Sequence, residues 1–192
     1  FGPSQIRLQV VSDKIIRVQA TAEQGFRDKQ SLIIVPQKGK ANYKVEEQGE
    51  QLIITTAAMR AVLNEATGQI TFYDLKDHVL LNEVAQGGKT FKPFTVPDRE
   101  IGVDIAKVPE SQKHGWSWRA LFDSPDNEAF YGLGQHQSEE LNMKGKNEDL
   151  FQYNTKVSVP FVISNKNYGI LWDSYSYCRW GNPEDYLQLN RA

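Results

Sequence analysis

The stretch IRLQVVSDKIIRVQA, residues 6–20, decides the fold class of this chain. Apolar side chains alternate with polar ones from Ile6 to Val10 and again from Ile16 to Ala20, with Ser12-Asp13-Lys14 between the two runs. Because successive side chains of a strand point to opposite faces, two alternating runs joined by a polar turn predict a β-hairpin.

The rest of the chain repeats this pattern of short apolar, β-branched runs separated by polar turns. No stretch keeps a 3.6-residue apolar period for three turns, so any helix is expected to be short. The connections between Gln86 and Lys113, rich in Gly and Pro, are expected to be irregular around one or two edge strands. Further strands are predicted at 31–35, 43–46, 51–56, 58–63, 69–75, 79–81, 116–122, 128–134, 150–153, 157–164, 168–173 and 175–180. A dozen or so strands at this spacing favour a two-sheet antiparallel β-sandwich.

The length and the net charge of the chain indicate how many domains to expect and which partners not to expect. The 192 residues predict one domain over residues 1–182, with a tail or the start of an inserted module at 183–192. A net charge of −2 gives no reason to expect a nucleic-acid partner, and no apolar run is long enough for membrane insertion as a helix. The lone Cys178 excludes an intramolecular disulfide, and the compartment is left open, with the periplasm or cell surface favoured over the cytoplasm.

Two glycine-rich stretches imitate nucleotide-binding motifs without completing them. Gly87-Gly88-Lys89-Thr90 resembles the end of a phosphate loop, but Glu83 stands where the first glycine of that motif is required. Gly132-Leu133-Gly134 begins a dinucleotide fingerprint whose third glycine position holds Gln137. Both are interpreted as structural, so no cofactor is expected.

The metal-ligating and nucleophilic residue types are scattered. His78, His114 and His136 each lie more than four residues from another His and from Cys178. A local metal motif is therefore lacking, and no metal site is expected. No Gly-x-Ser-x-Gly elbow points to a catalytic serine, and no catalytic residue is assigned.

Trp116 and Trp118 are the candidate sugar-stacking residues. Two residues apart on a strand, they share one face, where aromatic rings suit the C–H groups of a sugar. Packing in a core or against another domain is the competing interpretation, and it is the more frequent role of aromatic pairs. Trp172 and Trp180 lie in apolar strands and are expected in the core.

The most informative stretch is Phe130-Tyr131-Gly132-Leu133-Gly134-Gln135-His136. On a regular strand, Gly132 and Gly134 fall on one face and leave it bare. Since glycine weakens a strand, the pair predicts that another backbone or a ligand approaches closely, or that the strand is bulged.

The residues 130–136, 141–145, 152–155, 160–164 and 168–173 form an ordered series. This series resembles the N-terminal domain of glycoside hydrolase family 31, the α-glucosidases and α-xylosidases. Within the family it is most similar to xyloglucan-type α-xylosidases, which carry the Gln-x-Asn-Thr and Leu-Trp-Asp wording seen at Gln152–Thr155 and Leu171–Asp173.

The resemblance implies a galactose-mutarotase-like β-sandwich that precedes a catalytic (β/α)8 barrel. Such enzymes cleave with retention through two barrel carboxylates about 5–5.5 Å apart, so this chain alone is expected to be inactive. Its partners would be the downstream barrel and an oligosaccharide such as a xyloglucan fragment.

The resemblance also implies that one loop of the domain reaches the rim of the sugar pocket. In many α-glucosidases this loop reads Asn-x-Asp, and here the matching residues are Asn154, Thr155 and Lys156. Lysine replaces the carboxylate, which predicts a different contact to the leaving sugar, with Lys156 reaching outward. The sandwich is expected to lack its last strands, because some relatives carry an inserted module after this point.

Two other functions stay open at the level of sequence. The chain is a candidate stand-alone carbohydrate-binding module, with Trp116 and Trp118 as its platform. A mutarotase-like sugar epimerase is the other alternative, and it needs a histidine acid and a glutamate base on one concave face.

Overall fold

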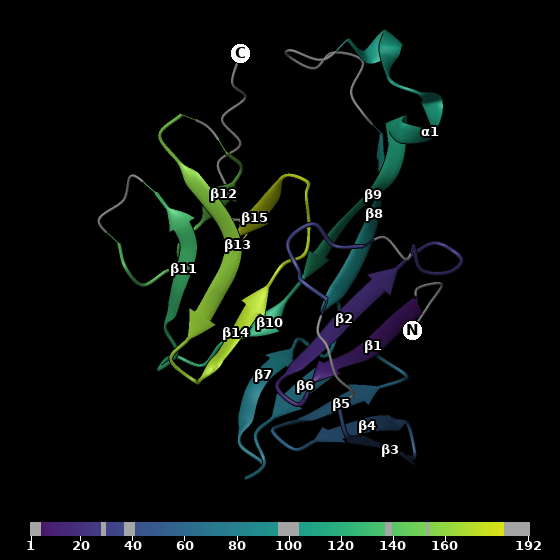
Figure 1. The fold of residues 1–192 in the computed structure, drawn as a ribbon, viewed down its shortest axis with the longest axis vertical. Coiled ribbons are helices and arrows are strands. Elements are labelled where there is room, and N and C mark those ends of the chain that lie inside the picture. Colours follow the sequence, from purple (N-terminus) through teal and green to yellow (C-terminus); the bar gives the residue numbers. More distant parts are fainter. Residues whose placement is uncertain are drawn as a thin grey trace. The chain divides into compact units, whose positions relative to one another are not determined.

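The computed structural model describes residues 5–27, 30–36, 41–95, 104–136, 140–152 and 154–182. Within these ranges almost every regular element is a strand and every strand pair is antiparallel, which confirms the predicted all-β class (Figure 1). None of the helices in the described ranges is long and apolar enough to cross a membrane. The predicted tail at 183–192 lies outside the described residues.

The chain contacts gather in two compact units, of which the first covers residues 5–27 and 41–123 as far as they are described. That the residues up to 182 act as one domain stays a prediction. The elements of this first unit are β1 (Gln5–Ser12), β2 (Ile15–Thr21), β3 (Tyr43–Gln48), β4 (Gln51–Thr56), β5 (Arg60–Asn64), β6 (Ile70–Tyr73), β7 (Val79–Glu83), β8 (Lys89–Thr95), η1 (Ile105–Lys107), α1 (Glu110–Lys113), β9 (His114–Ala120) and β10 (Phe122–Asp123).

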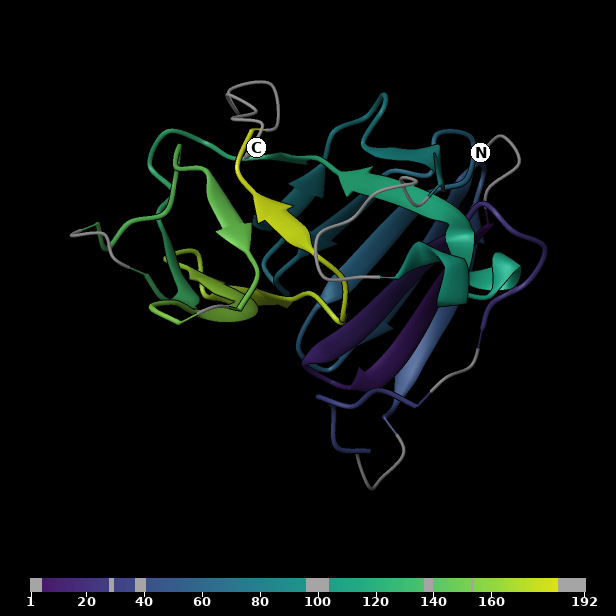
Figure 2. The ribbon, with the colours of Figure 1, turned by 90° about the horizontal axis from the view of Figure 1, so that it is seen from above.

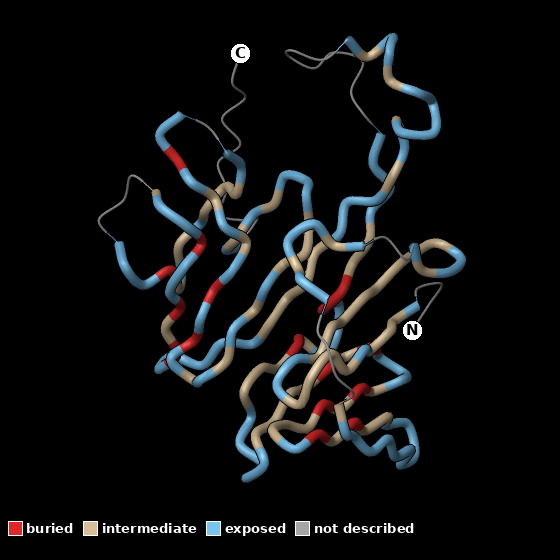
Figure 3. The backbone as a smooth tube through the Cα atoms, in the orientation of Figure 1, coloured by how far each residue is buried: buried red, intermediate tan, exposed pale blue. Residues whose placement is uncertain are grey.

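The first unit is built on a six-stranded sheet with the order β10-β7-β6-β5-β4-β3. Its buried apolar residues lie on β4, β5 and β6, and the tube coloured by burial shows buried segments in this sheet (Figure 3). Ile54 pairs with Ala61 and Leu63 with Ile70 across the ladder. The β1–β2 hairpin lies over this sheet (Figure 2), and Thr56 Oγ1 donates a hydrogen bond to Asp13 O in the hairpin turn. Period-two burial along β4 and β5 therefore creates the apolar face that the hairpin covers.

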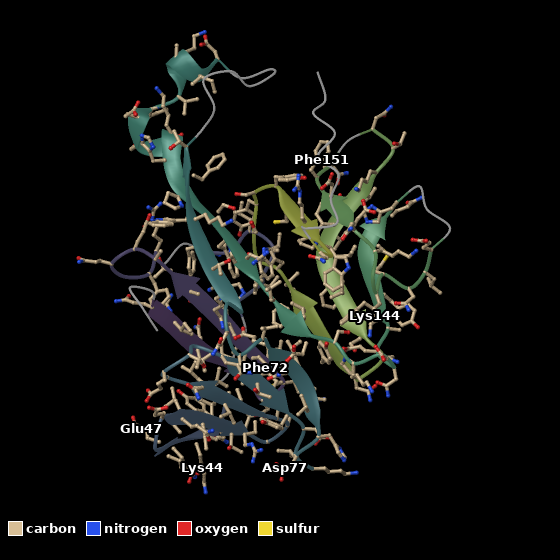
Figure 4. All side chains as sticks on the ribbon, turned by 180° about the vertical axis from the view of Figure 1, so that it is seen from behind. Lys44, Glu47, Phe72, Asp77, Lys144 and Phe151 are labelled. Atoms are coloured by element: carbon tan, nitrogen blue, oxygen red, sulfur yellow. The ribbon has the colours of Figure 1, made fainter. Side chains whose placement is uncertain are left out.

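The outer strand β3 is exposed along its whole length, with Lys44 and Glu47 pointing into solvent (Figure 4). Charged side chains on an edge strand discourage pairing with a second chain.

The second unit covers residues 30–36 and 124–182 as far as they are described. Its core consists of Phe130, Leu133, Met143 and Val162, and the indole of Trp180 meets the Phe130 ring edge-on, with ring centroids 5.2 Å apart. The sheets run β11-β13-β14 and β12-β15. The strands are β11 (Phe130–Gln135), β12 (Glu148–Leu150), β13 (Val157–Ser164), β14 (Tyr168–Leu171) and β15 (Cys178–Trp180).

One predicted strand is wrong. Residues 31–35 form no strand, because Ser31 Oγ accepts hydrogen bonds from the Ile33 and Ile34 amides at 3.2 and 3.1 Å. A side-chain hydroxyl that binds the local backbone in this way competes with a ladder. The strand predicted at 150–153 is shifted, since the residues that pair with β15 are 148–150.

Candidate functional site

The loop predicted to reach a sugar pocket begins with an exposed turn. Asn154 and Thr155 form that turn and are both exposed, whereas Lys156, which makes a single bridge after it, is buried. The three residues are thus consecutive in one loop, but only Asn154 and Thr155 are accessible to a ligand, whereas Lys156 is buried.

The Lys156 side chain is 9% exposed, and its Nζ donates to Glu148 Oε1 and to the Asp149 carbonyl. Glu148 is itself 17% exposed and lies on β12, so the pair ties the loop to the strand eight residues before it. Breaking a buried pair by removing one partner costs about 3–5 kcal/mol, because the other charge is left without a partner.

The expectation that Lys156 reaches outward is therefore wrong, because its side chain is buried against Glu148. Nothing in the sequence around Lys156 identifies Glu148 as its partner, because Glu148 lies on β12, Lys156 directly precedes β13 of a different sheet, and the two meet only in the folded unit. The position of the loop at a pocket rim stays a prediction.

His136 completes this cluster from the end of β11. Its ring is 7% exposed, Nε2 donates to the Leu133 carbonyl at 2.7 Å, and Nδ1 lies 3.2 Å from Glu148 Oε1 without meeting hydrogen-bond geometry. We call His136, Glu148 and Lys156 the Glu148 cluster. The bond from Lys156 to Glu148 and the bond from His136 to the Leu133 carbonyl hold the side chains of this cluster, next to the exposed turn in sequence.

Gly132 and Gly134 allow a close approach of the β13 backbone. Both have positive φ, +131° and +101°, and a Cβ on either would lie 2.5 Å from the Phe161 carbonyl oxygen or 2.0 Å from the Val157 carbonyl oxygen. The β11–β13 register shifts between the two glycines. The predicted backbone neighbour and the predicted bulge are both present, but the segment is not a regular strand with one bare face.

Trp116 and Trp118 lie on β9, opposite Pro93 and Phe91 of β8. Cross-strand partners point to the same side of a sheet, so the predicted shared face of the two tryptophans is confirmed. They are 44% and 43% exposed, which excludes a fully buried core role. Trp180, by contrast, packs on the core of the second unit, as predicted, and donates from Nε1 to the Met143 carbonyl.

Two further buried carboxylates were not identified from the sequence. Glu83 accepts hydrogen bonds from Lys89 Nζ and from the Ile70 amide, and Lys89 Nζ also donates to the Gly68 carbonyl. Lys89 of the phosphate-loop-like stretch is thus in a buried ion pair with Glu83, the residue that stands where that motif requires a glycine. Burial raises the pKa of Glu83 and lowers that of Lys89, while the attraction between the two opposes both shifts.

The second of these carboxylates is Glu128, which lies in the other unit. It accepts hydrogen bonds from Ser124 Oγ at 3.0 Å, Ser164 Oγ at 2.5 Å and Tyr168 Oη at 2.6 Å. Burial, and then the bond to Glu128, raise the pKa of the Tyr168 phenol. Three hydroxyl donors satisfy this carboxylate where it is buried.

One face of the β11-β13-β14 sheet is apolar and exposed. It alternates with the buried face along β13, and its cross-strand partners are Tyr131 on β11 and Leu171 on β14, together with Gly169 and the polar Gln135. Its exposed members are Tyr131, Val157, Val159, Phe161, Ile163 and Leu171. We call these six residues the β13 face, and a contiguous apolar surface of this kind marks an interaction site.

Two histidine–glutamate pairs bear on the epimerase alternative. His136 faces Glu148 inside the buried cluster, and His114 Nε2 lies 3.1 Å from Glu110 Oε1 at an exposed site. In both pairs the ring and the carboxylate face each other directly, whereas epimerisation needs both groups directed at a sugar. Among the described residues no three His, Cys, Asp or Glu side chains gather as metal ligands would.

The sequence and the structure of this chain are similar to those of known proteins. Residues 5–180 match the family described as the glycosyl hydrolase 31 N-terminal galactose mutarotase-like domain. The structure is similar to the GH31 α-xylosidase from Xanthomonas citri, with a TM-score of 0.82 and 38% identity over 95% of this chain and 18% of that chain.

Two other proteins are similar over nearly the same length. A GH31 α-xylosidase from a soil metagenome, solved in complex with xylose, has a TM-score of 0.72 and 26% identity over 92% of this chain and 26% of that chain. An α-xylosidase from Saccharolobus solfataricus is 25% identical over 92% of this chain and 23% of its own length. The chain therefore spans about a quarter or less of each of these three proteins.

Proposed function

The chain belongs to the glycosyl hydrolase 31 N-terminal galactose mutarotase-like family, and on that premise we propose that it is the non-catalytic N-terminal domain of an α-xylosidase. It supports a catalytic (β/α)8 barrel and lends a loop to the rim of the sugar pocket. The observation that carries this proposal is the match over residues 5–180 to a part, and only a part, of proteins named α-xylosidases.

The state of the buried carboxylates supports a non-catalytic role. Retaining hydrolysis needs one carboxyl free to attack the sugar and a second free to protonate the leaving oxygen. Glu83, Glu128 and Glu148 are each engaged by lysine or hydroxyl partners inside the units. Each of the three stabilises its own unit.

The β13 face supports a structural role in a longer protein. Its six apolar side chains are exposed, and this chain covers only 18% and 26% of the two similar α-xylosidase structures. We assign this face to packing against the polypeptide that follows the domain. Burying it would contribute about 25 cal/mol for each Å² of apolar surface removed from water.

The turn at Asn154 and Thr155 is proposed to border the pocket of the leaving sugar. Both residues are exposed, and the Lys156–Glu148 pair fixes the turn from below. In this arrangement Asn154 and Thr155 offer hydrogen bonds to sugar hydroxyls, and Lys156 positions them. Thr155→Ala is then expected to lower kcat/KM of the longer protein on xyloglucan oligosaccharides more than on an aryl xyloside, whose leaving group carries no hydroxyls.

The supporting role is tested by placing a charge on the β13 face. Ile163 is 51% exposed on β13, the middle strand of that sheet, and Val45, which is 52% exposed on β3, provides a matched control in the other unit. Ile163→Lys should leave the thermal unfolding of this chain almost unchanged. In the longer protein it should lower the unfolding temperature and the yield of active enzyme, whereas Val45→Lys should not. Equal behaviour of the two variants in the longer protein would remove the β13 face from the interface.

A further inference from the structure

The β8–β9 ribbon presents a continuous aromatic surface on one side. Phe91 pairs with Trp118 and Pro93 with Trp116 across the two strands, so all four rings project from the same side. The Phe91 and Trp118 rings stack at an interplanar angle of 16° with centroids 6.2 Å apart. We call these four residues the ribbon face.

The stack fixes the Trp118 indole without burying it. Trp116 and Trp118 keep 44% and 43% of their surfaces exposed, and they carry no formal charge. Two residues along a strand advance by about 6.8 Å, so the two indoles form a row rather than a single point of contact. A row of flat rings with electron-rich faces suits a ligand with successive C–H-rich surfaces.

Polar side chains continue the same side of the ribbon at the end where β8 stops and β9 begins. Thr95 pairs with His114 as the next cross-strand couple, and His114 Nδ1 lies 3.3 Å from Thr95 Oγ1. His114 Nε2 lies 3.1 Å from Glu110 Oε1, and Glu110 also pairs with Lys113 at 3.0 Å. The imidazole is therefore held on both sides, next to Trp116, among groups that can donate to and accept from hydroxyls.

We propose that the ribbon face is a carbohydrate-binding surface on which two successive pyranose rings of a neutral oligosaccharide stack, one on Trp116 and one on Trp118. Thr95 and Glu110, whose oxygens can form further hydrogen bonds, bind the hydroxyls of the sugar that projects past Trp116, and His114 holds the two side chains in place. The identification of the ligand as an oligosaccharide rests on the proposed function, but the surface is distinct from the turn at Asn154 and Thr155.

The composition of the ribbon face favours a sugar over a protein partner. Among the described residues of β8 and β9, no charged side chain lies between the two indoles, since Lys92 and Ser117 alternate to the opposite side of the ribbon. An uncharged ligand with apolar faces and a polar rim matches an uncharged aromatic row that ends in a polar group. The β13 face, which is aliphatic for the most part, lacks this combination.

The ribbon itself provides the control. Phe94 lies on β8, is 49% exposed and projects from the opposite side, opposite Gly115. Phe94→Ala therefore removes an aromatic ring of similar exposure without touching the ribbon face. Trp116→Phe keeps a flat ring at the site, and Trp116→Leu keeps apolar bulk without one.

The experiment is calorimetric titration of this chain with a xyloglucan heptasaccharide, with thermal unfolding of each variant as the check of folding. We expect Trp116→Ala and Trp118→Ala each to weaken binding about two- to tenfold, as loss of one aromatic stacking contact implies. Trp116→Phe should weaken it least, Trp116→Leu about as much as alanine, and Phe94→Ala not at all.

Three results would overturn the proposal. They are absence of binding to the unmodified chain at millimolar sugar, an equal loss with Phe94→Ala, and retention of affinity by Trp116→Leu. None of them bears on the supporting role, which depends on the Ile163→Lys comparison in the longer protein. A functional support domain with a ribbon face that binds no sugar is therefore a distinguishable outcome.

Discussion

Gly134→Ala tests the close approach of β13 to β11, because the cost of the added methyl group can be worked out from the structure. The new Cβ would lie 2.0 Å from the Val157 carbonyl oxygen and 2.9 Å from the Val159 amide nitrogen. The neighbouring atoms belong to the backbone and cannot rotate away, so β13 must shift, at a cost of about 1–3 kcal/mol. A φ of +101° adds about 1–3 kcal/mol for a residue with a side chain.

Gly145 separates the two contributions. It also has a positive φ, +69°, but a Cβ there would meet nothing within 4 Å. Gly145→Ala should therefore cost only about 1–2 kcal/mol of backbone strain. Gly134→Ala should cost about 4 kcal/mol in total, from the sum of the strain and the forced shift of β13.

The assay is urea unfolding of both variants beside the unmodified chain, followed by circular dichroism. The free energies of unfolding of the two variants should differ by roughly 2 kcal/mol or more, which is the share due to the clash. If the two variants lose the same stability, the β13 backbone is not where the structure places it, and the account of this segment fails.

Three other predictions concern buried groups. Lys156→Met should destabilise the chain by about 3 kcal/mol in urea unfolding. This is the low end of the range for a broken buried pair, because Glu148 keeps some exposure. A loss of stability below about 1 kcal/mol would contradict the pairing. Lys89→Met should cost about 3–5 kcal/mol, since its carboxylate partner is almost fully buried, and a neutral effect would show that the partner is already uncharged. The raised pKa of Tyr168 lets the folded chain keep the phenol proton above about pH 10, where the unfolded chain releases it, so stability should fall with rising pH there by up to about 1.4 kcal/mol per pH unit. Tyr168→Phe, which cannot ionise beside Glu128, should show a shallower fall in stability over this pH range. Parallel stability curves for the two proteins would exclude this phenol as the cause.

Local pattern was sufficient for most of the fold. Alternation and turn chemistry predicted the β1–β2 hairpin, and the predicted strand ranges overlap β3 to β7, β13 and β14. These features depend on residues close together in sequence. The prediction of a strand at 31–35 is wrong because Ser31 Oγ accepts hydrogen bonds from the Ile33 and Ile34 amides. Apolar periodicity carries no information about such a local bond.

The contacts of the candidate site were harder to predict from the sequence than the strands were, for a physical reason. A lysine after a turn is exposed in most proteins, so residue type alone pointed Lys156 toward solvent. Its actual partner, Glu148, comes from a strand whose register is set by pairing with Cys178–Trp180. The shared face of Trp116 and Trp118, in contrast, follows from strand periodicity alone, and the structure retains it.

The central claim, that this chain supports catalysis without performing it, is tested most directly by assaying the purified chain on an aryl α-xyloside. The account predicts no release of xylose above the uncatalysed rate, because catalytic carboxylates about 5–5.5 Å apart would be supplied by the barrel. Turnover that follows the chain through purification, and that disappears when one of its own glutamates is changed to glutamine in a variant that still folds, would contradict it.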